Sequence, residues 1–159
     1  MLNILVICTG NSCRSVIGEA LFNHLGQGRI QAFSAGSHPL GRINQGALAT
    51  LKRHGLPTEG YQSQSWEAFE HQPMDIVITV CDNAAGETCP VYLTKAVRAH
   101  WGVSDPGHAE GSEEEKIAAF EQTYRTLELR INAMLALPLE TMPPEELTAE
   151  LNAIGTLTA

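Results

Sequence analysis

Cysteine and arginine lie close together near the start of the chain, in the stretch Cys8-Thr9-Gly10-Asn11-Ser12-Cys13-Arg14-Ser15. The guanidinium of Arg14 can present a planar fork of N–H donors to two oxygens of a phosphate-like anion. A cysteine in the positive field of such a loop is favoured as the thiolate, which is the nucleophilic form. Cys8 is therefore the candidate nucleophile of an oxyanion site. A free cysteine is more often a small buried apolar residue, but its neighbours Gly10, Arg14 and Ser15 favour the catalytic interpretation.

The elements on either side of this stretch would direct it at one point. Residues 2–7 form a short run of mostly branched apolar side chains, typical of a strand buried on both faces. After the loop, Ile17, Leu21 and Leu25 recur on one side of a predicted helix. A loop between a buried strand and a helix start aims successive backbone N–H groups at one position, where the helix dipole also favours negative charge. A Walker-type phosphate loop is excluded, because no Gly-Lys-Ser/Thr follows.

Three further short runs predict the other strands of a parallel sheet, at residues 29–34, 74–80 and 96–101. The first strand, the helix and the second strand form a βαβ unit of about the usual length. The third run ends directly in Cys81, and Asp105 follows the fourth. Parallel strands end at the same edge of a sheet, so Cys81 and Asp105 are expected at the edge where the loop lies.

Caps and periodicity predict the remaining helices. Asn44 can cap a helix that Gly55 ends, and residues 65–70 suggest another short one. Ser112 opens a long amphipathic helix with a capping box, and Pro138 stops it. Residues 82–94 have the composition of a loop. Pro143-Pro144 begins a short additional helix.

Length and composition exclude several classes of protein. A chain of 159 residues suits one domain with a proper core. No apolar run approaches the length of a membrane span and no leader precedes the first strand, so we expect a soluble, unprocessed protein without a membrane partner. Four cysteines without a dense framework pattern favour the cytoplasm over secretion.

The net charge of −8 argues against nucleic acid, whose phosphates require a basic face. It also means that an anionic substrate gains little from long-range steering, so the loop itself must hold the anion.

The stretch from Cys8 to Ser15 resembles the phosphate-binding loop of the low-molecular-weight protein tyrosine phosphatases, and more closely that of their arsenate reductase relatives. Asp105-Pro106, between Trp101 and Gly107, is a second match. The resemblance implies a three-layer αβα fold, with a four-stranded parallel sheet and helices on both faces. It extends over about residues 1–137, and leaves residues 138–159 as a C-terminal extension with a short helix.

The segment from Cys81 to Cys89-Pro90 resembles the redox segment of the arsenate reductases, which ordinary phosphatases of this fold lack. The resemblance implies that Cys8 attacks arsenate, with Arg14 binding the anion and Asp105 donating a proton to the departing oxygen. Cys81 would then release arsenite, and Cys89 would attack Cys81. Thioredoxin or a glutaredoxin–glutathione system would reduce the final disulfide, and no cofactor is implied. The residues expected to bind arsenate, or phosphate or sulfate as its mimics, are Thr9, Gly10, Asn11, Ser12, Cys13, Arg14 and Ser15.

Other functions are also compatible with these residues. A tyrosine phosphatase needs only Cys8, Arg14 and Asp105, and a thiol-based redox sensor would need no turnover. A zinc site would draw on Cys8, Cys13, Cys81 and Cys89, but structural zinc usually takes more closely spaced pairs, so we predict no metal there. The spacing of Cys81 and Cys89 does not identify the reductant.

By position, Asn11, Glu19 and Ser34 resemble residues that brace the loop and, in some reductases, hold a potassium ion. The acidic side chain expected near Gln64 and Ser65 to complete that ion site is missing. Asn11 is therefore expected to brace the loop, and Ser15 resembles the hydroxyl that bonds to the nucleophilic thiolate.

Overall fold

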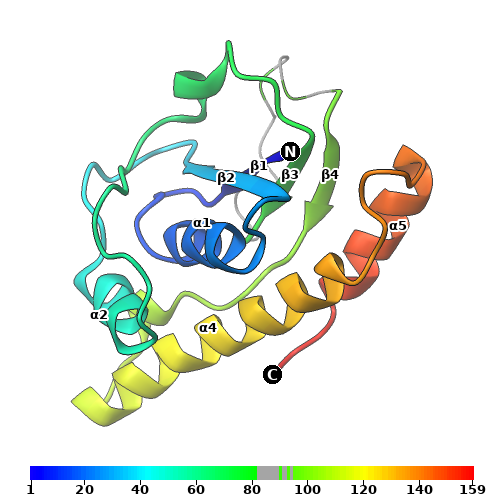
Figure 1. Ribbon diagram of the computed structural model, residues 1–159. Coiled ribbons are helices and arrows are strands. Elements are labelled where there is room, and N and C mark those ends of the chain that lie inside the picture. Colours follow the sequence, from blue (N-terminus) through cyan, green and yellow to red (C-terminus); the bar gives the residue numbers. More distant parts are fainter. Residues whose placement is uncertain (82–89, 91–92, 94) are drawn as a thin grey trace.

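A parallel sheet of four strands forms the centre of the molecule (Figure 1). The computed structural model describes residues 1–81, 90, 93 and 95–159. The strands are β1 (Leu2–Ile7), β2 (Ile30–Ala35), β3 (Ile76–Thr79) and β4 (Val97–His100). They lie in the order β2-β1-β3-β4, and every neighbouring pair is parallel. The predicted parallel sheet is confirmed.

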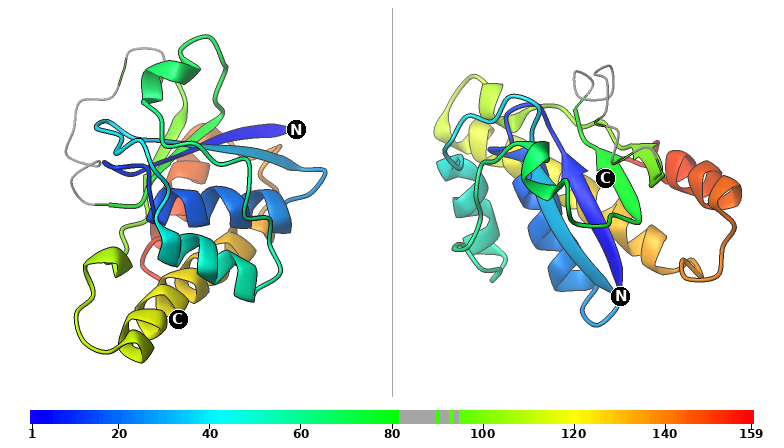
Figure 2. Two further views of the ribbon diagram at one scale, coloured as in Figure 1. Left: turned by 90° about the vertical axis from the view of Figure 1, so that its left-hand side faces the viewer. Right: turned by 90° about the horizontal axis from the view of Figure 1, so that it is seen from above.

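Four α-helices and two short 3-10 helices surround the sheet in the described part of the chain. The α-helices are α1 (Arg14–Leu25), α2 (Gln45–Arg53), α4 (Glu113–Leu135) and α5 (Pro144–Ile154). The 3-10 helices are η1 (Trp66–Phe69) and η3 (Pro106–His108). Helices α1, α2 and α4 lie on one side of the sheet and η1 on the other, and α5 packs beside β4 (Figures 1 and 2).

The central strands are buried on both faces, as their unbroken apolar runs predict. Residues 4–7 of β1 are completely buried, and all four residues of β3 are buried. The largest buried side chain, Trp101, follows β4 and stacks on Phe22 of α1 with ring centroids 5.8 Å apart. This core fixes the sheet edge at which β1 and β3 end.

The predicted element boundaries are close to the observed ones, with local differences. Asn44 caps α2 by accepting a hydrogen bond from the backbone of Ala47, and the capping box at Ser112 is present. The short helix predicted for residues 65–70 is a 3-10 turn. Strands β3 and β4 are shorter than the apolar runs 74–80 and 96–101 that contain them. The residues at the ends of each run are outside the paired stretch of the two strands. The loop predicted for residues 82–94, which includes Cys89, lies largely outside the described residues.

The chain after α4 packs against the β4 edge of the sheet. Leu147, Leu151 and Ile154 of α5 are buried, and the indole Nε1–H of Trp101 donates to the backbone carbonyl of Leu151 at 2.8 Å. None of the helices in the described ranges is long and apolar enough to cross a membrane.

Candidate active site

The loop from Cys8 to Cys13 connects the end of β1 to the start of α1 at the carboxyl edge of the sheet. Cys13 is the N-cap of α1, so Ser15 lies in the first turn of the helix rather than at its cap. The backbone N–H groups of Ser12 and Cys13 have no acceptor among the described residues. Unpaired N–H groups at a helix start attract an anion, through hydrogen bonds and through the helix dipole.

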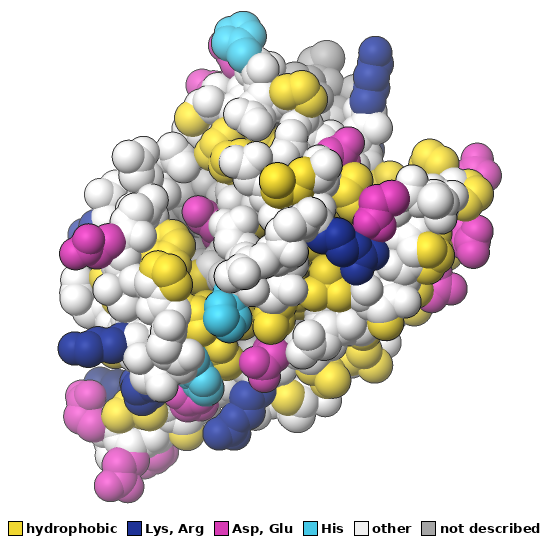
Figure 3. All heavy atoms as spheres, in the orientation of Figure 1, with side chains coloured by type: hydrophobic (Ala, Val, Ile, Leu, Met, Phe, Trp, Pro, Cys, Tyr) yellow, Lys and Arg dark blue, Asp and Glu magenta, His cyan; other side chains and the backbone are white. Residues whose placement is uncertain are grey.

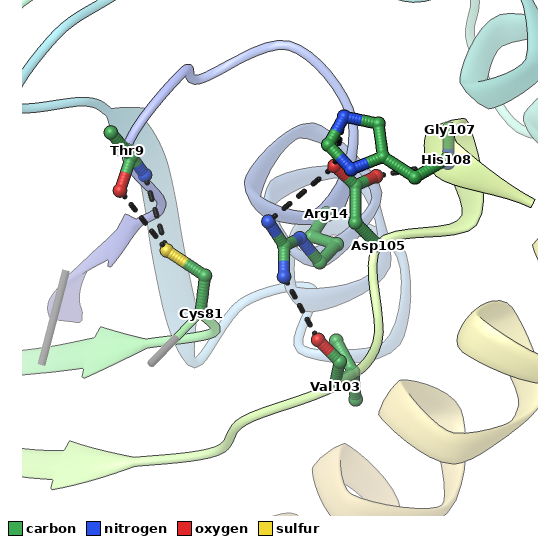
Figure 4. A network of polar contacts seen from close by, with 7 residues as sticks. All are labelled: Thr9, Arg14, Cys81, Val103, Asp105, Gly107 and His108. Atoms are coloured by element: carbon green, nitrogen blue, oxygen red, sulfur yellow. Dashed lines mark hydrogen bonds and ion pairs between the residues drawn. The ribbon is translucent and has the colours of Figure 1, made fainter. Parts of the chain in front are cut away.

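Arg14, the first residue of α1, directs its guanidinium across the sheet edge (Figure 4). Its Nη1 donates to the carbonyl of Val103 at 3.0 Å, and its Nη2 lies 3.7 Å from Oδ2 of Asp105. The remaining donor, Nε, is buried and has no acceptor among the described residues. A buried donor without a partner costs free energy, so a ligand oxygen that accepted this hydrogen bond would be stabilised.

The structure brings Cys8 and Cys81 together, and both side chains are buried. Ile7 pairs with Thr79 in adjacent parallel strands, so the two cysteines follow strand ends that lie side by side. The Cys81 side chain is close enough to Cys8 to be the largest influence on the ionisation of the Cys8 thiol. The sulfur of Cys81 also accepts the backbone N–H of Thr9 at 3.3 Å and lies 3.4 Å from its hydroxyl (Figure 4). The predicted partner Cys89 lies outside the described residues.

The local field at Cys8 differs from the one expected from the sequence. The neighbouring Cys81 side chain and burial raise the pKa of the Cys8 thiol well above its ordinary value. Arg14 and the backbone N–H of Gly10 act in the opposite direction but are outweighed. Cys8 therefore rests as a thiol. Burial beside a second sulfur outweighs the positive field of the loop, which by itself would favour the thiolate.

Asp105 precedes η3 and lies at the same sheet edge as Arg14, as its place after the fourth strand predicts. Its Oδ1 accepts the backbone N–H of Gly107 at 2.9 Å, and its Oδ2 lies 3.6 Å from Nε2 of His108. The side chain is about a quarter exposed. Burial and the nearby Asp105 raise the pKa of Cys13 to about 12, so Cys13 is a thiol within the loop.

A buried hydrogen-bond network braces the loop from behind. Asn11 adopts a left-handed backbone conformation with φ of 44°, which asparagine tolerates better than most residues. Its amide nitrogen donates to the hydroxyls of Ser15 and Ser34, each at 2.9 Å, and its oxygen accepts the backbone N–H of Gln64 at 2.8 Å. Ser34 in turn donates to Glu19. Asn11 thus holds the loop in place, the role expected from its position.

These residues do not fit a potassium site. The amide oxygen of Asn11 is already engaged by a backbone N–H, and the side-chain nitrogen of Gln64 lies 3.4 Å from the carbonyl of Ser34 as a donor. Glu19 is the one carboxylate of the network, and burial raises its pKa to about 7. Within the described ranges, no group of three or more His, Cys, Asp and Glu side chains could hold a metal ion.

Two contributors at this edge were not predicted from the sequence. The carbonyl of Val103 orients Arg14, and no sequence pattern distinguishes a single backbone carbonyl. Arg130 of α4 is buried against the segment before Asp105. A signal for it exists, because Arg130 lies three residues after Leu127 and four before Met134, on the apolar face of the helix.

Known proteins match most of the chain. The profile of the low molecular weight phosphotyrosine protein phosphatase family matches residues 3–152. The arsenate reductase of Bacillus licheniformis is 36% identical over 129 residues, which cover 80% of this chain and 91% of that protein. The arsenate reductase of Halalkalibacterium halodurans is 34% identical over 128 residues, with the same two shares.

Solved structures share the same architecture. An arsenate reductase in its phosphate-binding state matches with a TM-score of 0.66 at 27% identity, over 83% of this chain and 98% of that one. A low molecular weight protein tyrosine phosphatase from T. tengcongensis matches with a TM-score of 0.69 over 86% of this chain and 99% of that one. At 19% identity the second likeness shows the fold alone, and it confirms the predicted phosphatase-like α/β fold.

Proposed function

Because the chain belongs to the low molecular weight phosphotyrosine protein phosphatase family, we propose that it uses this family's oxyanion loop to reduce arsenate to arsenite. The observation that favours this proposal over phosphate-ester hydrolysis is the position of a second buried thiol, Cys81, beside Cys8 at the ends of two paired strands. Hydrolysis needs one nucleophile, whereas reduction of arsenate needs two electrons, which two thiols supply by forming a disulfide. The arsenate reductases among the relatives support the same choice.

In the first step, Arg14 and the loop N–H groups bind dihydrogen arsenate, and the sulfur of Cys8 attacks arsenic. A sulfur–arsenic bond forms and an arsenic–oxygen bond breaks. The thiol proton and the departing oxygen leave as part of one water molecule. We assign Asp105 the transfer of the proton to that oxygen, and its 3.7 Å contact with Arg14 supports the assignment.

In the second step, Cys81 attacks the sulfur of Cys8. The electron pair of the sulfur–arsenic bond passes to arsenic, which is reduced from As(V) to As(III) and leaves as arsenite. The two sulfurs are oxidised to a Cys8–Cys81 disulfide, and the proton of the Cys81 thiol passes to an oxygen of the departing arsenite. The pairing of β1 with β3 supports this order, because it places Cys81 beside Cys8 before the reaction begins.

In the third step, Cys89 attacks Cys81 and releases Cys8 as a thiol. An external dithiol then reduces the Cys81–Cys89 disulfide. We propose thioredoxin or a glutaredoxin–glutathione system for this role, in the cytoplasm where such reductants keep thiols reduced. The role of Cys89 is inferred from its position in the sequence alone.

The experiment that tests the function is an arsenate-dependent assay with each reductant system in turn. Wild-type protein is expected to release arsenite in many turnovers with one of them, and Cys8→Ser is expected to release none. Hydrolysis of an aryl phosphate is measured in parallel. If aryl phosphate is turned over and arsenate is not reduced even in a single turnover, the protein is a phosphatase and the proposal is wrong.

A further inference from the structure

Two arginines hold three successive backbone carbonyls just before Asp105. Nη1 of Arg130 donates to the carbonyls of Trp101 at 2.8 Å and Gly102 at 3.2 Å. Arg14 donates to the next carbonyl, that of Val103. The segment between β4 and η3 is therefore held at its start by α4 and at the active site by α1.

Arg130 is a buried cation, with only 4% of its surface exposed. No carboxylate in the described part of the chain lies within ion-pair distance of it. Burial lowers its pKa, as expected for a charge balanced only by backbone carbonyls. The buried guanidinium of Arg130 holds its carbonyl partners firmly. If one of these carbonyls moved, a buried N–H donor would be left unpaired, which costs free energy.

The third acceptor of Arg130 belongs to the C-terminal tail, which we define as residues 155–159 after α5. Nε of Arg130 donates to the carbonyl of Leu157 at 2.9 Å. Ala159 is also attached to α4, because its carbonyl accepts from Gln122 at 2.7 Å and its N–H donates to Thr126 at 3.4 Å. The same guanidinium thus joins the tail to the segment that leads to Asp105.

The backbone of the segment is also bonded to the end of β3, because the N–H of Trp101 donates to the carbonyl of Thr79 and the N–H of Val103 to that of Val80. Hollows lie on two other sides of the segment. One hollow, of about 680 Å³, opens at Arg14 and Cys81 and is lined on its far side by Asn152, Gly155 and Thr156. The other, of about 460 Å³, is lined by Arg130 and by Thr158 of the tail. Residues 102–105 line both.

We propose that the C-terminal tail, acting through Arg130, is a positioning device that sets the segment 101–105 and hence the guanidinium of Arg14 and the carboxyl of Asp105. This inference rests on the proposed function, in which Arg14 binds the oxyanion and Asp105 transfers a proton. The carbonyl of Val103 decides where Arg14 points. A shift of the preceding carbonyls would therefore move the guanidinium of Arg14, including its buried and unpaired Nε–H.

The test compares loss of the tail carbonyl with loss of a tail side chain. A chain ending at Thr156 lacks the acceptor for Nε of Arg130, whereas Leu157→Ala keeps that carbonyl. Arg130→Lys keeps the charge but not the planar fork, and exposed Arg125→Lys is its matched control on the same helix. Three quantities are measured on fully reduced, folded protein: binding of inorganic phosphate, arsenite released in a single turnover, and the NMR signal of the Arg14 Nε–H.

The chain ending at Thr156 and Arg130→Lys should bind phosphate about tenfold more weakly and release arsenite about tenfold more slowly, the effect of losing one charge-assisted hydrogen bond. Both changes should shift the Arg14 Nε–H signal, and the two controls should leave all three quantities near the wild-type values. Wild-type values in either altered protein would overturn the positioning role. If wild-type protein releases no arsenite, the proposed function fails, but phosphate binding and the Arg14 signal still decide this inference.

Discussion

At the scale of single residues, the site combines a thiol that resists ionisation with a guanidinium whose donors are only partly used. Arg14 donates through Nη1 to Val103, while its Nε has no acceptor among the described residues. Its planar shape is therefore as important as its charge, because one nitrogen is fixed by the protein while another keeps its hydrogen bond for a ligand. The raised pKa of Cys8 means that its proton must leave during the attack.

Arg14→Lys tests whether the fork matters. A lysine ammonium cannot hold the carbonyl of Val103 and an arsenate oxygen in the same fixed geometry, so kcat/KM for arsenate should fall about 100-fold or more. Arg98→Lys, at an exposed position of β4, is the control and should keep wild-type kinetics. Steady-state rates measured over a range of arsenate concentrations decide this. A fall in kcat/KM of less than about threefold, which corresponds to less than about 1 kcal/mol, would show that the charge alone is sufficient.

Glu19 gives the bracing network a dependence on pH. Its pKa is raised from an ordinary 4.5 to about 7 by burial, so in this range the folded protein binds a proton that the unfolded chain has lost. The stability that Glu19 contributes is therefore fully present below about pH 4.5. It is lost as the pH rises to about 7, and it does not change further above that pH. Glu19→Gln, which can still accept from Ser34, should raise the free energy of unfolding at pH 8 by about 1–3 kcal/mol.

Urea unfolding of wild type and Glu19→Gln at pH 5 and pH 8 measures this effect. The difference between the two proteins should be small at pH 5 and large at pH 8. Glu59→Gln, an exposed neighbour lining the same hollow, should show no such difference. Equal pH dependence in wild type and Glu19→Gln would mean that Glu19 is ionised in the folded protein throughout the range.

At the scale of elements, sequence patterns predict the sheet edge well and its long-range contacts poorly. Branched apolar runs identify the strands because both faces of β1 and β3 are buried, and parallel pairing then places Cys8, Cys81 and Asp105 at one edge. The raised pKa of Cys8 could not be predicted, because it depends on the distance between two sulfurs far apart in the chain. The contacts of Arg130 depend in the same way on how α4 lies against the segment that follows β4.

The order of the thiol relay follows from the pairing of these elements. Because strand register already brings Cys81 to Cys8, Cys89→Ser should release about one arsenite per molecule and then stall as a Cys8–Cys81 disulfide. Cys81→Ser should not complete that first release. Arsenite is counted in a single turnover, and peptide mapping identifies the disulfide. Wild-type multiple turnover by Cys89→Ser with thioredoxin would rule out the relay; if it occurs only with glutathione and glutaredoxin, a mixed disulfide replaces the last step.

At the scale of the whole molecule, the loop must attract its anion against an unfavourable net charge of −8. On the face shown in Figure 3, basic side chains are scattered among acidic ones rather than gathered in one field. Local donors at the sheet edge therefore have to provide the binding energy. Any part of the chain that fixes that edge then affects the site, including α5, which packs beside β4.

We propose that residues 138–159 are required for the stability of residues 1–137. Leu151 is completely buried in α5 and its carbonyl accepts from Trp101. Leu151→Ala should lower the free energy of unfolding by about 2–5 kcal/mol, the usual cost of a cavity at a fully buried leucine. Leu157→Ala, at a position 38% exposed, should change it by less than about 1 kcal/mol.

Removal of residues 138–159 should have a larger effect than either substitution. It would uncover Trp101 and strip four buried side chains from the core, those of Leu139, Leu147, Leu151 and Ile154. At about 1.5–3 kcal/mol each, their burial is comparable to the whole stability of an ordinary domain, about 5–15 kcal/mol. Urea unfolding followed by Trp101 fluorescence, with Trp66 replaced by phenylalanine, measures the change. A cooperative transition of the 1–137 fragment at the wild-type midpoint would show that the extension packs on the domain without stabilising it.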